Sequence, residues 1–148
     1  MTRHVVRPFE PGDFEAWYPL WRAYQAFYET DIPLEASRTT WRRFHDPDEP
    51  MWGAFALEGP RPVGIVHYLR QRTTWSVGDL CYLEDLYVED GVRGSGVGRR
   101  LIEHVYSRAR AMGCVQVYWL THETNANARL LYDRIAARSG FVHYRKVL

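Results

Sequence analysis

Three glycines on alternate positions, Gly94, Gly96 and Gly98, form the stretch of sequence whose composition points most directly to chemistry. They lie between an apolar run that ends at Val88 and a segment whose apolar side chains recur with helical spacing from Val97. Without Cβ atoms, such a turn can aim successive backbone N–H groups into one concavity at a helix N-terminus, where anions bind. The spacing therefore predicts a site for a phosphate or pyrophosphate group.

Two common nucleotide motifs do not fit these glycines. A triphosphate site requires G-x-x-x-x-G-K-[ST], which the sequence lacks, and a dinucleotide site requires G-x-G-x-x-G after an early strand. Here Arg99 takes the place of the third glycine, and the motif lies past the middle of the chain. The pattern Arg93-x-x-Gly96-x-Gly98 instead resembles the pyrophosphate loop of the GNAT acetyltransferases, although a turn that merely connects two elements is the alternative. The resemblance implies that acyl-CoA is held by Arg93, Gly94, Ser95, Gly96, Val97, Gly98 and Arg99.

The composition indicates one domain, residues 1–148, and excludes several kinds of partner. A chain of 148 residues is long enough to bury a substantial core. Its net charge of +1 gives no general attraction to nucleic acid or to acidic membranes. The six histidines show no ligand spacing, so we predict no metal site. Cys81 and Cys114 are too few for a disulfide framework, and we interpret both as reduced core residues.

The expected compartment follows from segments that the sequence lacks. Residues 1–8 do not contain the apolar core of a signal peptide. No apolar run approaches the length of a membrane span. We therefore expect a cytoplasmic protein without a membrane partner.

Apolar periodicity and turn residues divide the chain into alternating elements. Asp13 is expected to cap the first helix, Pro19 to kink or divide it, and Gly113 to end the third helix in a left-handed conformation. Strands are predicted for residues 3–8, 51–57, 63–70, 81–88, 115–122 and 141–148, and helices for 14–28, 33–45, 97–112 and 125–139.

This order of elements resembles the GNAT fold over essentially the whole chain. The resemblance implies an α/β (α+β) domain in which a mixed central sheet carries helices on both faces. In that family the fourth and fifth strands are parallel neighbours that splay apart, and acyl-CoA inserts between them. Leu86, Tyr87 and Val88 would then present backbone groups to the pantetheine, much as an added strand pairs with an edge.

Two segments narrow the resemblance within the family. The run from Tyr82 to Val88, YLEDLYV, is similar to the fourth strand of the spermidine/spermine acetyltransferase branch. The tail, from Tyr118 through Asn125 to the end of the chain, resembles the fungal histone-and-polyamine acetyltransferase group. Many members place Gly-Phe four residues after the helix tyrosine, whereas Gly140 follows Tyr132 by eight, which predicts a last helix about one turn longer. The fungal group is known as dimers and larger oligomers, so the resemblance implies a homodimer.

Glu84 is the candidate base for the acceptor amine. An alkyl amine with a pKa near 10.4 is almost entirely protonated at pH 7, so transfer requires a base or a base-bound water. The matching position in the polyamine branch is a glutamate that acts through water. The alternative is a carboxylate that pairs with an arginine and only stabilises the sheet. Strand alternation places Asp85 on the opposite face from Glu84, unless a bulge interrupts the strand.

Tyr132 matches the tyrosine that GNAT enzymes place beside the thioester sulfur as a general acid. The alternative is a core tyrosine on an amphipathic helix. The pattern Asn125-x-x-Ala128-x-x-Leu131-Tyr132 favours the catalytic interpretation. The resemblance also implies that Asn125, and less directly Asn127, bonds the pantetheine, while a helix N-cap is the other reading of Asn125.

The sequence thus predicts an acetyl-CoA-dependent N-acetyltransferase that acts on a primary amine. The acceptor stays open among polyamines, amino acids, small amines and protein lysines, because the fold does not determine the substrate. A catalytically silent acyl-CoA-binding sensor is the alternative, and the presence of both Glu84 and Tyr132 argues against it. Five aromatic residues line an acceptor groove or else pack as core: Trp17, Trp21, Tyr24, Tyr28 and Trp41.

Overall fold

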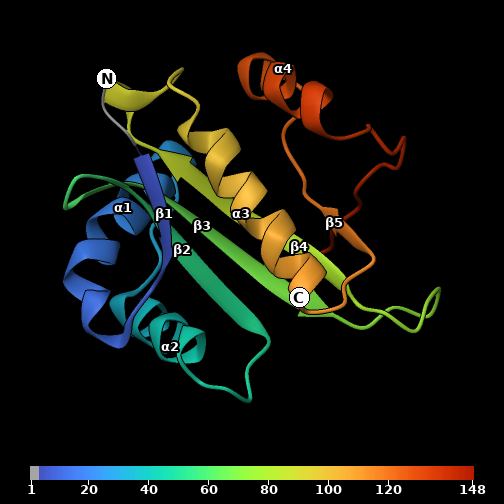
Figure 1. Cartoon of the computed structure of the whole chain (residues 1–148), viewed down its shortest axis with the longest axis horizontal. Coiled ribbons are helices and arrows are strands. Elements are labelled where there is room, and N and C mark those ends of the chain that lie inside the picture. Colours follow the sequence, from blue (N-terminus) through green and yellow to red (C-terminus); the bar gives the residue numbers. More distant parts are fainter. Residues whose placement is uncertain (1–3) are drawn as a thin grey trace.

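The computed structural model describes residues 4–148 and is built around a five-stranded sheet in the order β1-β2-β3-β4-β5 (Figure 1). Neighbouring strands pair antiparallel from β1 to β4, and β4 pairs parallel with β5, so the predicted mixed sheet is confirmed. Residue 3 of the first predicted strand lies outside the described residues. The strands are β1 (His4–Pro8), β2 (Met51–Glu58), β3 (Arg61–Gln71), β4 (Leu80–Val88) and β5 (Gln116–Tyr118).

Helices cover both faces of the sheet, as the sequence predicts (Figure 1). Two of them, α1 (Phe14–Phe27) and α2 (Leu34–Phe44), pack on one face. The other two, α3 (Val97–Ala111) and α4 (Ala126–Ile135), lie on the opposite face. Short 3-10 turns precede α1 and α3, at Pro11–Asp13 and Asp90–Val92. Within the described chain, none of the helices combines the length and apolar character that a membrane crossing requires.

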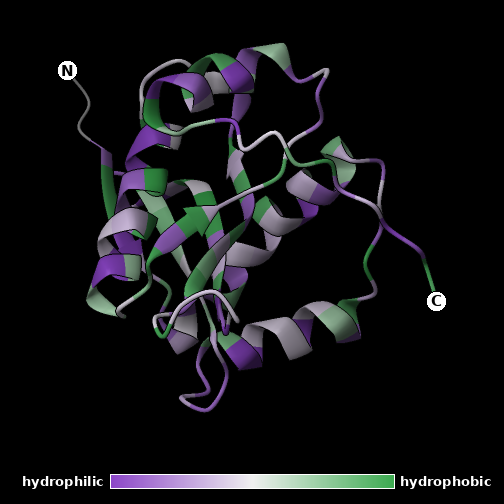
Figure 2. Ribbon diagram, turned by 90° about the vertical axis from the view of Figure 1, so that its right-hand side faces the viewer, coloured by the Kyte–Doolittle hydropathy of each residue, from purple (hydrophilic) through white to green (hydrophobic). Residues whose placement is uncertain are grey.

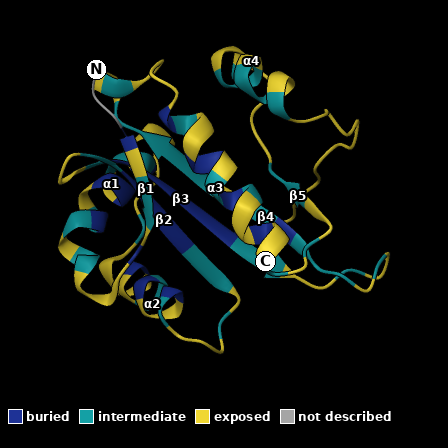
Figure 3. Ribbon diagram, viewed as in Figure 1, coloured by how far each residue is buried: buried dark blue, intermediate teal, exposed yellow. Residues whose placement is uncertain are grey.

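Strand alternation produces two separate cores. Phe55 and Ile65 point toward α1 and α2, whereas Ala56 and Val66 point toward α3. Figure 3 shows the buried centre of β2 and β3 between these helices, and Figure 2 shows polar and apolar residues alternating along the ribbons that cover the sheet. Three of the five predicted groove aromatics are buried in the first of these cores, which favours the packing interpretation for them: Trp17, Trp21 and Trp41.

The first helix differs from the prediction in two details. It runs without interruption through Pro19, so the expected division is wrong. Proline removes one backbone donor there, but Trp17 and Trp21 are buried on either side of it and anchor both halves of the helix. The Asp13 side chain does not cap the helix, because its two oxygens accept hydrogen bonds from the Arg7 guanidinium at 2.7 and 3.2 Å.

The C-terminal third of the chain departs most from the prediction. The fifth strand covers only 116–118, α4 ends at Ile135 rather than 139, and residues 141–148 form no strand. The longer last helix is therefore wrong, since Ala136 is already extended with φ −152°. A strand requires a neighbour for its backbone groups, and within residues 4–148 the tail meets none. Its aromatic side chains are instead exposed, Phe141 by 92% and Tyr144 by 90%.

Candidate active site

An opening between β4 and β5 lies at the centre of the predicted site. The two strands pair through only three residues each, from Leu80 opposite Gln116 to Tyr82 opposite Tyr118, and then separate (Figure 1). Beyond that point Leu86, Tyr87 and Val88 remain paired with β3 on one side only. The predicted splay is therefore present, and it leaves this edge of β4 without a neighbouring strand, where an extended ligand can pair.

The glycine loop has the backbone geometry of an anion site. Gly94 and Gly96 have φ values of +84° and +86°, which side chains rarely adopt. Gly96 also forms the N-cap of α3, and its carbonyl accepts the first helical bond, from the Arg100 N–H at 3.1 Å. The N–H groups of the first turn, which begins at Val97, come before this first helical hydrogen bond. They therefore have no acceptor within α3 and lie at the positive end of the helix dipole.

The polar side chains of this loop form hydrogen bonds with the end of β4, with α3 and within the loop. The Arg93 Nε donates to the Val88 carbonyl at 2.9 Å, and its guanidinium lies 5.7 Å from the ring centroid of Tyr87. Arg99 donates to Glu103 at 2.9 Å, and the Ser95 hydroxyl donates to a backbone carbonyl of the same loop. Arg93 therefore holds the loop against the end of β4.

Tyr132 lies on α4, at the junction of α4 with the end of β5 and with α1. Its ring meets Trp119 edge-on at 5.3 Å between centroids. Burial is the main cause that raises the pKa of its phenol, and the neighbouring Tyr28 phenol raises it further. The next residue back, Leu131, lies 3.8 Å from where a Cβ on Gly98 would be, so α4 packs against the start of α3. The predicted acid is thus near the predicted pyrophosphate loop.

The two asparagines lie at the start of α4. The Asn125 carbonyl accepts from the Arg129 N–H at 3.1 Å, while its side-chain amide donates to the Thr121 hydroxyl at 3.3 Å. Asn125 occupies the N-cap position of α4, as one interpretation expected, but its side chain makes no capping hydrogen bond. Asn127 is exposed in the first turn of the helix. Both amides are therefore on the α4 side of the opening.

A β-bulge places Glu84 in an irregular position. His67 pairs with Asp85 and Tyr68 pairs with Leu83, which leaves Glu84 as the extra residue of β4. The alternation that was expected to separate Glu84 from Asp85 is interrupted, and that expectation fails. Glu84 is an exposed residue, but desolvation of its carboxyl by neighbouring groups raises its pKa, the Asp85 charge raises it further, and His67 opposes the shift. Within residues 4–148, the ion pairs do not include Glu84, so the arginine-paired alternative is not observed.

Asp85 joins the bulge to a hydrogen-bonded chain that the sequence alone does not indicate. His67 Nδ1 lies 2.9 Å from Asp85 Oδ2, and the Trp17 Nε1–H donates to His67 Nε2 at 3.0 Å. Burial and the Asp85 charge both raise the pKa of the Tyr24 phenol. A histidine within the apolar β3 run is a visible signal, but its partner depends on a register that only the bulge produces.

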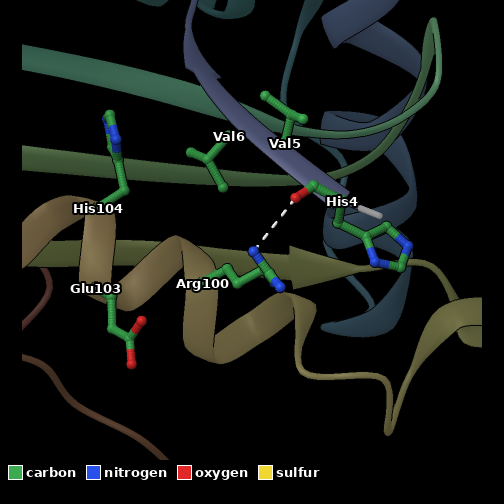
Figure 4. A pocket seen from close by; sticks show the side chains of 6 residues that line it. All are labelled: His4, Val5, Val6, Arg100, Glu103 and His104. Atoms are coloured by element: carbon green, nitrogen blue, oxygen red, sulfur yellow. Dashed lines mark hydrogen bonds between the residues drawn. The ribbon is translucent and has the colours of Figure 1, made fainter. Parts of the chain in front are cut away.

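A separate pocket lies away from these residues. Figure 4 shows it between the edge strand β1 and the first half of α3, where the Arg100 guanidinium donates to the His4 carbonyl at 3.4 Å. Its lining contains none of the predicted site residues: His4, Val5, Val6, Arg100, Glu103 and His104. The chemistry predicted from the sequence therefore belongs to the β4–β5 opening and not to this pocket.

Curated proteins with similar sequences are acetyltransferases. The chain is 45% identical to the D-amino-acid N-acetyltransferase HPA3 of Saccharomyces cerevisiae, over 97% of this chain and 91% of that protein. It is 34% identical to the thialysine N-epsilon-acetyltransferase of Caenorhabditis elegans, over 56% of this chain and 51% of that protein. The similarity to HPA3 thus extends over nearly the full length of both chains.

Solved structures and a family model agree with this similarity. An aminoglycoside acetyltransferase from an uncultured soil sample superposes with a TM-score of 0.84 at 20% identity, covering 98% of this chain and 96% of that chain. The structure of aminoglycoside acetyltransferase AAC(6')-Iy with a bisubstrate analogue superposes with a TM-score of 0.85 at 16% identity, covering 99% of this chain and 100% of that chain. These two likenesses show the fold. The model of the Acetyltransferase (GNAT) family matches residues 14–137, and the chain therefore belongs to this family of acetyl-CoA-dependent N-acetyltransferases.

Proposed function

We propose that this protein transfers the acetyl group of acetyl-CoA to the primary amine of a small amino acid. The observation that carries the proposal is the β4–β5 opening, which has the glycine loop at one end and the Glu84–Asp85 bulge beside it. Its relatives support the acceptor class, because they are named for D-amino acids, thialysine and L-ornithine. Each of these acceptors is an amino acid.

The donor occupies the opening in this proposal. The pyrophosphate binds the N–H groups of the loop from Arg93 to Arg99, and the pantetheine extends along the free edge of Leu86, Tyr87 and Val88. The Asn125 amide, with Asn127 next to it in the first turn of α4, bonds the pantetheine from the other side. This arrangement places the thioester at the α4 side of the opening, where Tyr132 lies.

The acceptor amine must lose a proton before it attacks the thioester carbon. At pH 7 only about one alkyl amine in two to three thousand is unprotonated. Glu84, directly or through a water, takes this proton, and its raised pKa makes it a stronger base than a glutamate with an ordinary pKa. The amine nitrogen then forms the new bond to the acetyl carbon, the carbon–sulfur bond breaks, and Tyr132 donates a hydrogen bond or proton to the departing CoA thiolate.

A panel of amines tests the proposed function. D-amino acids, L-ornithine, thialysine, spermidine and a lysine peptide are incubated with acetyl-CoA, and released CoA thiol is measured. We expect the highest kcat/KM with one of the amino acids. Acetylation of the peptide or of spermidine alone would contradict the acceptor class. Binding of acetyl-CoA without CoA release from any amine would instead favour the silent sensor.

Acetyl-CoA is expected to raise the melting temperature at concentrations where ATP and NAD do not. Ligand at about 100 times Kd stabilises a native fold by about 2.7 kcal/mol. Gly96→Val should abolish this shift, because a β-branched side chain at φ +86° distorts the backbone that meets the phosphate. Gly59→Val is the matched control, since its φ of +59° imposes similar strain in the β2–β3 turn. A shift with NAD alone, or one retained in Gly96→Val, would contradict the loop assignment.

We also propose that the protein is a homodimer. The resemblance to the fungal group implies it, and the exposed apolar tail supports it, because exposed apolar surface of this kind favours association. Light scattering coupled to size exclusion should give twice the mass of one chain. A chain shortened after Gly140 tests the tail, with Arg145→Ala in the full-length chain as the control. A monomer over the whole accessible concentration range would contradict the proposal.

A further inference from the structure

The chain of contacts behind Asp85 fixes the protonation state of a buried histidine. Trp17 and His67 are 0% and 2% exposed, and their ring nitrogens lie 3.0 Å apart. An indole N–H only donates hydrogen bonds, so the His67 Nε2 must be the acceptor and cannot carry a proton. The proton of the neutral ring is then on Nδ1, which lies 2.9 Å from Asp85 Oδ2 and donates to it.

Surrounding aromatic rings hold the imidazole in this orientation. The ring centroids of Phe44 and Trp21 lie 4.8 and 5.0 Å from that of His67, and Phe9 lies at 5.9 Å. These neighbours come from α2, from α1 and from the segment after β1. A ring flip would direct a carbon atom at the Trp17 donor and leave that buried N–H unsatisfied, which is costly. The geometry therefore permits one orientation and one tautomer.

The buried hydrogen-bonded chain ends at Asp85, next to Glu84 in the bulge of β4. Its side chain is 14% exposed, beside Glu84 in the bulge and beside the Tyr24 phenol of α1. His67 uses Oδ2, and the Tyr24 phenol hydrogen-bonds the same carboxylate. A carboxylate offers about four lone pairs, so Asp85 can still accept a hydrogen bond from a ligand amine. Because a neutral imidazole donates without adding a positive charge, Asp85 keeps its full negative charge for a cationic group.

We propose that His67 is a positioning residue that acts through Asp85, holding this carboxylate as a fixed anchor for the cationic amine of the acceptor. The proposal rests on the proposed function, and it assigns different roles to two adjacent carboxylates. Asp85 binds and orients the ammonium, while Glu84 removes the proton. Without the His67 bond, the Asp85 side chain could rotate, and the acceptor would be held in several orientations rather than one.

The first test measures the tautomer and does not depend on activity. In protein with ¹⁵N-labelled histidine, the His67 ring is expected to show a protonated Nδ1 and an unprotonated Nε2 at neutral pH, assigned by comparison with His67→Asn. Trp17→Phe removes the indole donor and should allow Nε2 to become protonated. A ring protonated on Nε2 in the wild-type protein, or doubly protonated, would overturn the proposal.

The second test is a double-mutant cycle on the acceptor kinetics. His67→Leu should lower kcat/KM for the amine about 10- to 100-fold, mainly through KM, while KM for acetyl-CoA stays unchanged. Asp85→Asn should cause a similar loss. The double variant should be little worse than either single variant, because both remove the same anchor. His67→Asn, whose amide can donate from the position of Nδ1, should recover part of the activity.

Ser37→Ala is the matched control for lost packing. It removes the acceptor of another buried indole, since the Trp21 Nε1–H donates to the Ser37 hydroxyl at 3.1 Å in the same core. This variant should lower the melting temperature without changing KM for the amine. Additive losses in the cycle, or an equal rise of KM in Ser37→Ala, would overturn the positioning role. If no amine is acetylated, the proposed function fails, and the tautomer measurement still decides whether His67 holds Asp85.

Discussion

Replacing Tyr132 by phenylalanine is expected to lower kcat about 10²- to 10⁴-fold, the range for a positioned proton donor. Acetyl-CoA affinity should barely change, because in the proposed mechanism the phenol contacts the sulfur only as charge develops on it. A phenol, with a pKa near 10, is a weaker acid than a thiol near 8.5, and burial raises the Tyr132 pKa further. The contribution that we propose for Tyr132 is therefore mainly a hydrogen bond that strengthens in the transition state. Steady-state kinetics and a direct binding titration measure the two effects.

Tyr106→Phe is the matched control for this variant. Its hydroxyl donates to the Ile135 carbonyl at 3.0 Å, so it also contacts α4, and it is outside the predicted set of site residues. Loss of that hydroxyl should reduce stability slightly and leave kcat unchanged. Thioesters with a more acidic thiol should suffer less from Tyr132→Phe, since their thiolate needs less help. Full activity in Tyr132→Phe would falsify the catalytic role.

Glu84→Gln is expected to lower kcat/KM for the amine by about 10² or more at pH 7, with little change in acetyl-CoA binding. The loss should shrink as the pH rises, because free amine then accumulates without a base. Asp85, Tyr82, Tyr118 and His67 face this carboxyl, and burial with the Asp85 charge raises its pKa. Wild-type activity should therefore decline with falling pH earlier than an ordinary glutamate would allow.

The pH–rate profile distinguishes a base from a structural carboxylate. In Glu84→Gln the acid limb that belongs to Glu84 should disappear. Asp85→Asn is the comparison, since it keeps the base and should mainly raise KM for the amine. A loss that is the same at every pH would assign Glu84 to structure or to substrate positioning.

Local chemistry made the backbone of the glycine loop and the position of α3 predictable, whereas acetyl-CoA binding by this loop stays a prediction. Left-handed backbone is favourable only for residues such as glycine, so Gly94 and Gly96 marked the loop in the sequence, and their φ values confirm it. Apolar spacing likewise located α3, whose buried side chains follow the predicted face, including Leu101 and Val105. These features depend on residues that are close together in the chain.

The acceptor side could not be predicted in the same way. The bulge at Glu84 is a property of the register between β3 and β4, and nothing near Glu84 in the sequence specifies it. The Trp17–His67 bond joins residues 50 positions apart and needs that register and α1 together. The strand predicted at residues 141–148 is absent for a related reason, because a segment forms a strand only where a neighbouring strand is available to pair with it.

Because β5 pairs with β4 over only three residues, we expect acetyl-CoA binding to reduce local opening of α4. Residues 116–135 are held to the rest of the chain by few contacts. Only three residues of β5 pair with β4, and α4 contains no buried residue. Amide hydrogens in α4 should therefore exchange with solvent well before those of β2 and β3, since local opening is easiest where few contacts must break. Acetyl-CoA bridges β4 and α4 in the proposed complex, so part of its binding energy is spent on closing α4. The decrease in the amide exchange rate of α4 on adding acetyl-CoA would measure how strongly binding favours the closed position of this helix.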